Sequence, residues 1–478
     1  MHNAYSKLFL LIDGEWLSAD GRDVSPVVNP ATGETIGEVP HATRADLDAA
    51  LASSQRAFKT WRNTSAYERA KVLRKTAELL RARSEDIATK LTLEQGKPLF
   101  EARYEVASSA DYFEWFAEEG RRVYGRIVPP RNQAVHQLVR REPIGPVAAF
   151  APWNFPAITP TRKIAAALAA GCSVIIKPGE ECPATALEIA RALHDAGLPP
   201  GVLNVVFGAP AEISEYLIAS PVTRKVSFTG SVPVGRHLSV LAGQALKPIT
   251  LELGGHAPAL IFEDADLESA ARILAAGKFR GTGQICLSPT RILVQKPVHE
   301  KFLDLFAKAT EGLKVGNGLD PKTQVGPISN QRRIDAVSDL ISDATARGAR
   351  IVTGGQRIAG PGLFWQPTIL ADIPTAAKVM HEEPFGPLAL VLPFDTIDDA
   401  LEESNRLPYG LAAYAFTESA RTAIRVGKEL DAGMIGINHT QMIVCELPFG
   451  GVKDSGHGSE GGAEGIQSYL TTKFISQV

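Results

Sequence analysis

Residues 147–176, VAAFAPWNFPAITPTRKIAAALAAGCSVII, decide the fold class of this chain. Short apolar runs rich in β-branched residues alternate here with a helical pattern, and the alternation continues toward residue 228. Strands of this kind are typical of a parallel, doubly wound sheet, which binds ligands beyond the carboxyl ends of its strands. The expected elements are strands at 147–150, 171–176, 202–207 and 226–228 and helices at 164–170 and 184–193.

The flanking sequence predicts further units on either side. A second alternating α/β unit runs from residue 257 to about residue 438, with strands expected at 260–262, 292–294 and 388–392. Residues 43 to about 120 have a helical pattern, in which Ser65 and Glu68 form a capping box. Residues 125–132 and 137–140 predict two short strands joined by a turn, a protruding hairpin suited to pairing with another subunit.

The composition is that of an ordinary globular protein. Of 478 residues, 45% are hydrophobic and 22% are charged, with a formal net charge of −3. There is no polybasic segment for nucleic acid or an anionic membrane, and no apolar run approaches the roughly 18–20 residues of a membrane-spanning helix. The first 16 residues lack the features of a signal peptide. Four cysteines do not form a disulfide framework or a metal-ligand spacing, so we expect a cytoplasmic protein without a metal site.

Cys286 is the first candidate for chemistry. It follows the loop GTGQI at 281–285, whose two glycines permit an unusual backbone that presents the thiol to a cleft as a nucleophile. The alternative is a small buried side chain in a loop, the common role of a free cysteine. Cys172 lies in a predicted strand and is assigned to the core, and Cys182 and Cys445 have no activating neighbour in the sequence.

Glu252 ends an apolar strand in the run LELGG at 251–255. A buried, unpaired carboxylate has a raised pKa, and such a group serves as a general base near neutral pH. A glutamate at a strand edge that faces solvent is the alternative.

Asn154, in PWNFP at 152–156, is placed to donate an amide N–H to an oxyanion, or else to cap a helix. Lys177 and Glu180 offer a cation and a carboxylate to ribose hydroxyls, or else form a solvated turn. Gly230 and Gly235 give Gly-x-x-x-x-Gly at a strand-to-helix turn, where backbone amides can meet a phosphate. The usual Gly-x-Gly-x-x-Gly dinucleotide fingerprint is absent.

Taken in order, these motifs resemble the aldehyde dehydrogenase superfamily over nearly the whole chain. They are Asn154, Lys177, Glu180, Gly230, Glu252, Cys286, EPFGP at 383–387 and PFGG at 448–451. The resemblance implies a doubly wound dinucleotide-binding domain, an α/β catalytic domain and a small β-hairpin that builds a homodimer or homotetramer. The implied boundaries are 1–122 and 144–251 for the first domain, 252–438 for the second, and 123–143 with 439–478 for the oligomerisation hairpin and C-terminal segment.

The resemblance also implies roles. Cys286 corresponds to the nucleophile that attacks the aldehyde, Glu252 to the base that activates water for thioester hydrolysis, and Asn154 with the Cys286 amide to the oxyanion hole. The cofactor residues implied are Trp153, Lys177, Glu180, Gly230, Ser231, Gly235, Glu383 and Phe385. A carboxylate at Glu180 favours NAD because it repels a 2′-phosphate, while the neighbouring Lys177 leaves NADP possible.

The implied substrate is a small ω-oxo carboxylate. Arg162 and Arg280 match the arginines that bind the distal carboxylate in semialdehyde dehydrogenases, although two surface arginines are the alternative. The chain is most similar to the succinate-semialdehyde and 2-oxoglutarate-semialdehyde types. Thr159, Ser288 and Phe449 complete the expected substrate site, with Thr159 where the 2-oxoglutarate type uses Gln and Ser288 where some relatives have a second cysteine.

We therefore expect NAD(P)-dependent oxidation of a semialdehyde to a dicarboxylic acid. The alternatives are a broad aldehyde dehydrogenase for uncharged substrates and a non-catalytic binding protein on the same fold. Transfer of the acyl group to coenzyme A is disfavoured, because a base such as Glu252 directs water to the thioester.

Overall fold

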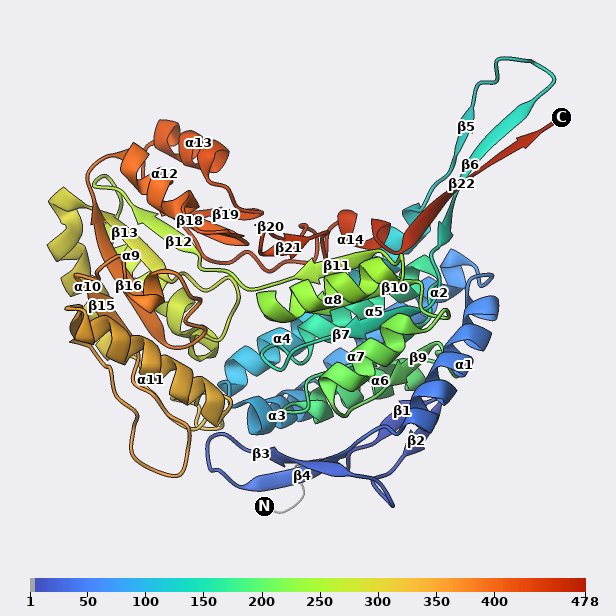
Figure 1. The fold of residues 1–478 in the computed structure, drawn as a ribbon, viewed down its shortest axis with the longest axis horizontal. Helices are drawn as coiled ribbons and strands as arrows, with labels where there is room; N and C mark the ends of the chain where they lie inside the picture. The colour runs from blue at the N-terminus through green and yellow to red at the C-terminus, as the bar shows by residue number, and fades with distance from the viewer. Residues whose placement is uncertain (1–4) are drawn as a thin grey trace.

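The chain is built around two large sheets, which Figure 1 shows beside one another in a computed structural model that describes residues 5–478. The first sheet has the strand order β2-β1-β9-β8-β7-β10-β11-β21. Its strands are β1 (Leu10–Ile12), β2 (Glu15–Leu17), β7 (Val147–Phe150), β8 (Val174–Lys177), β9 (Leu203–Val205), β10 (Lys225–Thr229), β11 (Ile249–Glu252) and β21 (Gly456–His457). Its crossover helices are α5 (Ile158–Ala170), α6 (Pro183–Asp195), α7 (Pro210–Ala219) and α8 (Val232–Gln244).

The central strands of this sheet are parallel, and the chain reverses its direction of progress between β7 and β10. From β7 it adds β8 and β9 on one side, and it then returns to place β10 and β11 on the other. The register aligns Phe150 with Lys177 and Thr229 with Glu252, so these strands end at one edge. Ligands of doubly wound sheets bind at such a switch point, and the structure confirms the predicted fold class.

The second sheet has the order β14-β15-β16-β13-β12-β18-β19 and is parallel except for the β14–β15 pair. Its strands are β12 (Pro258–Ile261), β13 (Arg291–Gln295), β14 (Arg350–Thr353), β15 (Thr368–Ala371), β16 (Leu388–Phe394), β18 (Ala412–Phe416) and β19 (Met434–Ile437). Its helices are α9 (Leu267–Phe279), α10 (His299–Glu311), α11 (Gln331–Ala346), α12 (Ile397–Asn405) and α13 (Ala420–Glu429).

An arm of three antiparallel strands projects from the body (Figure 1). β5 (Arg126–Val128) pairs with β6 (His136–Pro143), as the sequence predicted, and β22 (Leu470–Gln477) adds a third strand from the C-terminal segment. The apolar side chains of Ile127 and Phe474 are 80% and 79% exposed on this arm.

The N-terminal segment supplies the helices α1 (Arg44–Trp61), α2 (Ala66–Ala82), α3 (Ser84–Gln95) and α4 (Leu99–Glu119). Ser65 caps α2 by accepting the amide of Glu68 at 3.2 Å. The second half of the predicted capping box was wrong, because the Glu68 carboxylate pairs with Lys71 one turn later instead of reaching back. Among residues 5–478, no helix combines the length and apolar character needed to cross a membrane. Minor elements are β3 (Val24–Val28), β4 (Thr35–Pro40), β17 (Tyr409–Gly410), β20 (Val452–Lys453) and α14 (Glu464–Gln467).

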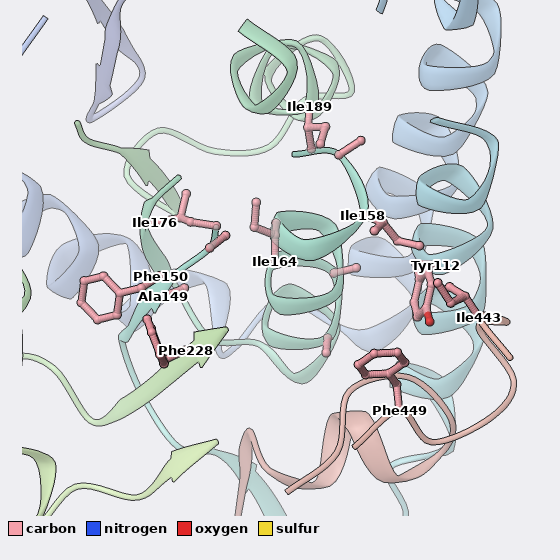
Figure 2. Close-up of a cluster of buried hydrophobic side chains, with 14 of the residues drawn as sticks. Tyr112, Ala149, Phe150, Ile158, Ile164, Ile176, Ile189, Phe228, Ile443 and Phe449 are labelled. Carbon is pink, nitrogen blue, oxygen red and sulfur yellow. The ribbon is translucent and has the colours of Figure 1, made fainter. Parts of the chain in front are cut away.

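Helix α5 is central to the core because it packs between the first sheet and α4. Figure 2 shows Ile164 on this helix, with Ile158, Tyr112, Ile443 and Phe449 gathered on one side of it. All of these side chains are buried, and burying one isoleucine contributes about 1.5–3 kcal/mol. The packing thus joins α4, α5 and the C-terminal segment around one end of the sheet.

Candidate active site

Cys286 is carried by a loop of unusual backbone conformation. Gly281, Thr282 and Gly283 have φ values of 53°, 57° and 68°, in the left-handed region that non-glycine residues rarely adopt. The Thr282 hydroxyl donates to the carbonyl of Gly326 at 3.0 Å, which holds this strained residue. At Gly283 a Cβ atom would lie 2.1 Å from the carbonyl oxygen of Gly386. The structure confirms the predicted loop, and it directs Cys286 into a cavity of about 530 Å³.

This cavity lies at the carboxyl edge of the first sheet and is closed on its other side by the loop before β16 and the C-terminal segment. It gathers most of the residues singled out in the sequence. Those that line it are Trp153, Asn154, Thr159, Arg162, Gly230, Ser231, Glu252, Cys286, Glu383, Phe385 and Phe449. Residues so far apart in the chain converge because they follow β7, β10 or β19, end β11, lie between α9 and β13, or precede β16.

Glu252 is buried, with 2% of its surface exposed, and neither carboxylate oxygen has a hydrogen-bond partner. Burial raises the pKa of Glu252 well above its ordinary value, and the neighbouring Glu460 raises it further. The alternative of a glutamate facing solvent is excluded. A carboxylate without partners in a cavity is free to take a proton from water or from a thiol.

Glu460 and Lys163 are neighbours of this base that the sequence reasoning missed. They form a buried ion pair, with 2.5 Å between Lys163 Nζ and Glu460 Oε1, and Lys163 also donates to the hydroxyl of Thr229 at 2.8 Å. The only sequence signal was a lysine beside Arg162 on the same helix. The Gly-rich stretch around Glu460 gave no indication that the carboxylate of Glu460 is buried beside Glu252.

Asn154 lies in the loop between β7 and α5 and is held there by hydrogen bonds. Its side-chain amide donates to the carbonyl of Gln284 at 2.9 Å, and its own carbonyl accepts from Lys97 Nζ at 2.9 Å. Lys97 forms a buried ion pair with Glu105, whose carboxylate also accepts the amide of Ala157 at 2.8 Å. Asn154 does not cap α5, which leaves the oxyanion interpretation of its amide.

The Cys286 thiol is neutral in this environment. Burial raises the pKa of Cys286 to about 12, the carboxylates Glu383 and Glu252 raise it as well, and Arg162 opposes them. A thiolate forms here only when a positive charge approaches or a base removes the proton.

The part of the cavity nearer β10 has the features of a dinucleotide site. Ser231 precedes α8 and its side chain makes no capping hydrogen bond, so the first amides of this helix are free to meet a phosphate. Glu383 accepts the Gly255 amide at 3.2 Å, and burial raises the pKa of Glu383 to about 7. The rings of Trp153 and Phe385 meet edge to face, with 5.8 Å between their centroids. These donors, acceptors and rings fit a nicotinamide dinucleotide.

Two arginines line the cavity. Arg333 donates to the carbonyls of Pro384 and Phe385. The other is Arg162. Its guanidinium lies between two aromatic rings, 3.9 Å from the centroid of Phe449 and 5.2 Å from that of Tyr112. The residue is 5% exposed, and Nε has no hydrogen-bond partner. Within residues 5–478 it forms no ion pair, since the nearby Glu460 is bound to Lys163.

Five predicted residues do not line this cavity. Lys177 and Glu180 form an ion pair with each other just beyond β8. Gly235 lies on α8, where a Cβ would lie 2.5 Å from the Leu253 side chain, so its position serves close packing. Two others, Arg280 and Ser288, were expected in the substrate site.

Arg280 is half-buried, and its guanidinium lies 5.6 Å from the ring of Tyr104 and 6.0 Å from that of Phe155. Ser288 is turned away from the cavity, because its hydroxyl donates to the carbonyl of Lys278 at 3.2 Å and accepts from Lys278 Nζ at 3.1 Å. The structure thus places Arg162 in the cavity and Arg280 outside its lining.

Comparisons with known proteins agree with this geometry. The profile of the aldehyde dehydrogenase family matches residues 16–475. A putative 4-(hydroxymethyl)benzenesulfonate dehydrogenase of Comamonas testosteroni is 49% identical over 98% of each chain. The NADP(+) succinate-semialdehyde dehydrogenase of Escherichia coli (strain K12) is 42% identical over 97% of this chain and 96% of its own. The crystal structure of succinate-semialdehyde dehydrogenase from Burkholderia pseudomallei superposes with a TM-score of 0.97, at 41% identity, covering 100% of this chain and 99% of that one.

Proposed function

Because this chain belongs to the aldehyde dehydrogenase family, and is therefore an NAD(P)-dependent oxidoreductase, we propose that it oxidises an aldehyde whose far end carries an anionic group. The observation that carries the proposal is Arg162, a buried guanidinium without an ion-pair partner among the described residues. An uncompensated buried charge costs several kcal/mol, so such a charge in a cavity indicates a site for an anionic ligand. The proposed substrates are ω-oxo carboxylates such as succinic semialdehyde and 2-oxoglutarate semialdehyde, oxidised to dicarboxylic acids.

Each step of the proposed reaction is assigned to residues of the cavity. The Cys286 thiol would lose its proton to solvent when a positively charged cofactor ring lies beside it. Sγ then attacks the aldehyde carbon and forms a C–S bond, while the side-chain amide of Asn154 and the backbone amide of Cys286 donate to the oxygen that becomes negative. A bound nicotinamide ring supplies the hydride acceptor. Glu252 then takes a proton from water, which attacks the thioester, releases the acid and restores the thiol. Glu460, in its ion pair with Lys163, lies next to Glu252, and its negative charge raises the pKa of Glu252 and so strengthens this base.

An aromatic substrate with a sulfonate group is a second candidate. The relative from Comamonas testosteroni is named for a benzenesulfonate, and Phe155, Ile158, Ile443 and Phe449 give this cavity an apolar and aromatic wall. A sulfonate and a carboxylate share the negative charge that a guanidinium recognises. The runner-up, a broad enzyme for uncharged aldehydes, leaves the unpaired charge of Arg162 without a role.

Replacing Arg162 tests the substrate class. Arg162→Leu is expected to lower kcat/KM for succinic semialdehyde about 100-fold, or about 2.7 kcal/mol, because the anion loses the cation beside Phe449. The other arginine of the lining, Arg333, already donates to the carbonyls of Pro384 and Phe385. A neutral aldehyde of matched length should change little. The measurement is NADH formation with both acids, 4-formylbenzenesulfonate and the neutral aldehyde, on the wild type and the variant. Equal wild-type rates with the charged and neutral aldehydes would show a general aldehyde dehydrogenase instead.

We propose NAD as the preferred cofactor, with NADP as a slower alternative. Glu180 follows β8, where its carboxylate accepts ribose hydroxyls and repels a 2′-phosphate. Its ion pair with Lys177 weakens that repulsion without removing it.

Glu180→Gln is expected to raise the ratio of kcat/KM for NADP to that for NAD about tenfold, since the negative charge is lost and Lys177 is released. Steady-state kinetics with both cofactors at saturating aldehyde provide the measurement. Glu181→Gln is the matched control, because that adjacent carboxylate pairs with Arg332 instead. An unchanged ratio in both variants would mean that Glu180 does not set the choice.

We propose further that the arm assembles a homodimer or homotetramer. We also propose a cytoplasmic location, in which the four free cysteines stay reduced. The exposed side chains Ile127 and Phe474 support this, because apolar surface of this kind marks a contact with another chain. The variant Ile127→Lys/Phe474→Lys is expected to elute at a smaller mass than the wild type in size-exclusion chromatography with light scattering. Identical masses would remove the arm from the interface.

A further inference from the structure

Two tyrosines of α4, Tyr104 and Tyr112, each contact a backbone carbonyl of the C-terminal loop and the guanidinium of an arginine. The hydroxyl of Tyr104 donates to the carbonyl of Ile443 at 3.4 Å, and the hydroxyl of Tyr112 donates to the next carbonyl, that of Val444, at 3.3 Å. These carbonyls belong to the C-terminal loop, residues 439–447, which places Ile443 in the cavity wall. Figure 2 shows Tyr112 beside Ile443.

Each ring also lies under one of the two arginines expected to bind the substrate. Tyr112 lies under Arg162, with 5.2 Å from the ring centroid to Cζ, and Tyr104 lies under Arg280 at 5.6 Å. One helix therefore holds both guanidinium groups and both carbonyls of the loop. Nothing in the proposed chemistry uses either tyrosine.

A ring is a suitable support for a cation that must bind an anion. It attracts and orients the guanidinium through its face without neutralising the charge, and Nε of Arg162 has no hydrogen-bond partner. A carboxylate in the same place would neutralise the charge and occupy the donors. Arg162 contacts two rings, Tyr112 and Phe449, which together restrict the orientation of its guanidinium.

We propose that Tyr104 and Tyr112 are positioning residues that set the preference for anionic aldehydes, by orienting Arg280 and Arg162 through their rings and by fixing the C-terminal loop through their hydroxyls. Tyr112 acts at the cavity, because Arg162 lines it. Tyr104 acts outside the lining, where its 49% exposed side chain and the half-buried Arg280 meet a longer substrate. The inference rests on the proposed function, since it concerns recognition of the anionic end.

The two contacts of each tyrosine can be separated by substitution. Tyr112→Leu removes the ring, and we expect its KM for succinic semialdehyde to rise about tenfold while kcat and the KM for a neutral aldehyde of matched length change less than twofold. Tyr112→Phe keeps the ring and should restore the preference for the acid. Loss of the hydroxyl, which both variants share, should change the KM of either aldehyde equally and less than twofold, because the hydroxyl contacts the carbonyl of Val444, next to the lining residue Ile443, whatever the charge of the substrate.

Tyr104→Leu is the companion variant. Position 104 tolerates substitution because half of the tyrosine side chain is exposed. We expect this variant to raise the KM for 4-formylbenzenesulfonate more than that for succinic semialdehyde. A purely structural role would lower activity with charged and neutral aldehydes alike. That result in both leucine variants would overturn the inference, as would wild-type kinetics in both.

Arg162→Leu, measured in parallel, separates the positioning inference from the proposed function. If it loses the preference and the tyrosine variants keep it, only the positioning roles fail. If the wild type shows no preference for acids, the proposed function itself fails.

Discussion

Replacement of Cys286 by alanine is expected to lower aldehyde oxidation by about 10⁴-fold or more, close to complete loss, because it removes the atom that forms the covalent bond. Cys286 is the only thiol among the residues that line the cavity within the described chain. The hydroxyls of Thr159, Thr229 and Ser231 also line it, but none is carried on the strained loop that directs Cys286 inward. The measurement is steady-state NADH formation with succinic semialdehyde and with a neutral aldehyde.

Two controls make this result specific to the thiol. Cys445→Ala removes a nearly buried thiol that does not line the cavity, and it should keep wild-type activity within a few-fold. Binding of NAD to Cys286→Ala, followed through the fluorescence of Trp153 and the other tryptophans, should be unchanged, because no cofactor contact is lost. Retention of more than a tenth of the wild-type rate by Cys286→Ala would reject the thiol as nucleophile.

The parts of the site that follow from local sequence were predictable. The glycines before Cys286 predicted an unusual backbone, which the structure shows as three left-handed residues. The apolar run around Glu252 left a buried and a solvent-facing carboxylate as alternatives, and the structure shows the buried one. Both signals are local, because a glycine spacing and a strand pattern report the conformation of the residues that carry them. The carboxyl edge of the first sheet places Glu252 in the cavity, and the loop between α9 and β13 of the second unit brings Cys286 to the same cavity.

The partners of these residues could not be predicted in the same way. The pairing of Lys163 with Glu460 joins positions 297 residues apart, and each is an ordinary charged residue in its own segment. The same holds for Arg162, whose ring contacts come from α4 and from the C-terminal segment. The resemblance indicated two equivalent arginines, but only Arg162 lines the cavity, and Arg280 lies outside the lining near the rings of Tyr104 and Phe155.

Glu252→Gln is expected to stop the reaction after its first half. Attack by Cys286 and loss of the hydride still occur, so each subunit should release about one NADH in a burst. Steady-state turnover should fall about 10²–10⁴-fold, since no base activates the water that attacks the thioester. Rapid-mixing absorbance at 340 nm separates the burst from turnover, and mass spectrometry of the quenched protein should find the acyl group on Cys286. Full turnover without a burst would assign the base to another residue.

The raised pKa of Glu252 fixes the direction of the pH dependence. Below that pKa the carboxyl group holds its proton and cannot take another from water, so turnover should rise with pH and level off above it. Glu460 raises the pKa of Glu252 through its like charge. Glu460→Gln should therefore move the rising limb of the profile to lower pH, because burial alone then opposes ionisation. Two results would show that a different group titrates: a rising limb that stays at the same pH in Glu460→Gln, or one that persists in the residual turnover of Glu252→Gln. The buried Glu383 would then be the next residue to replace.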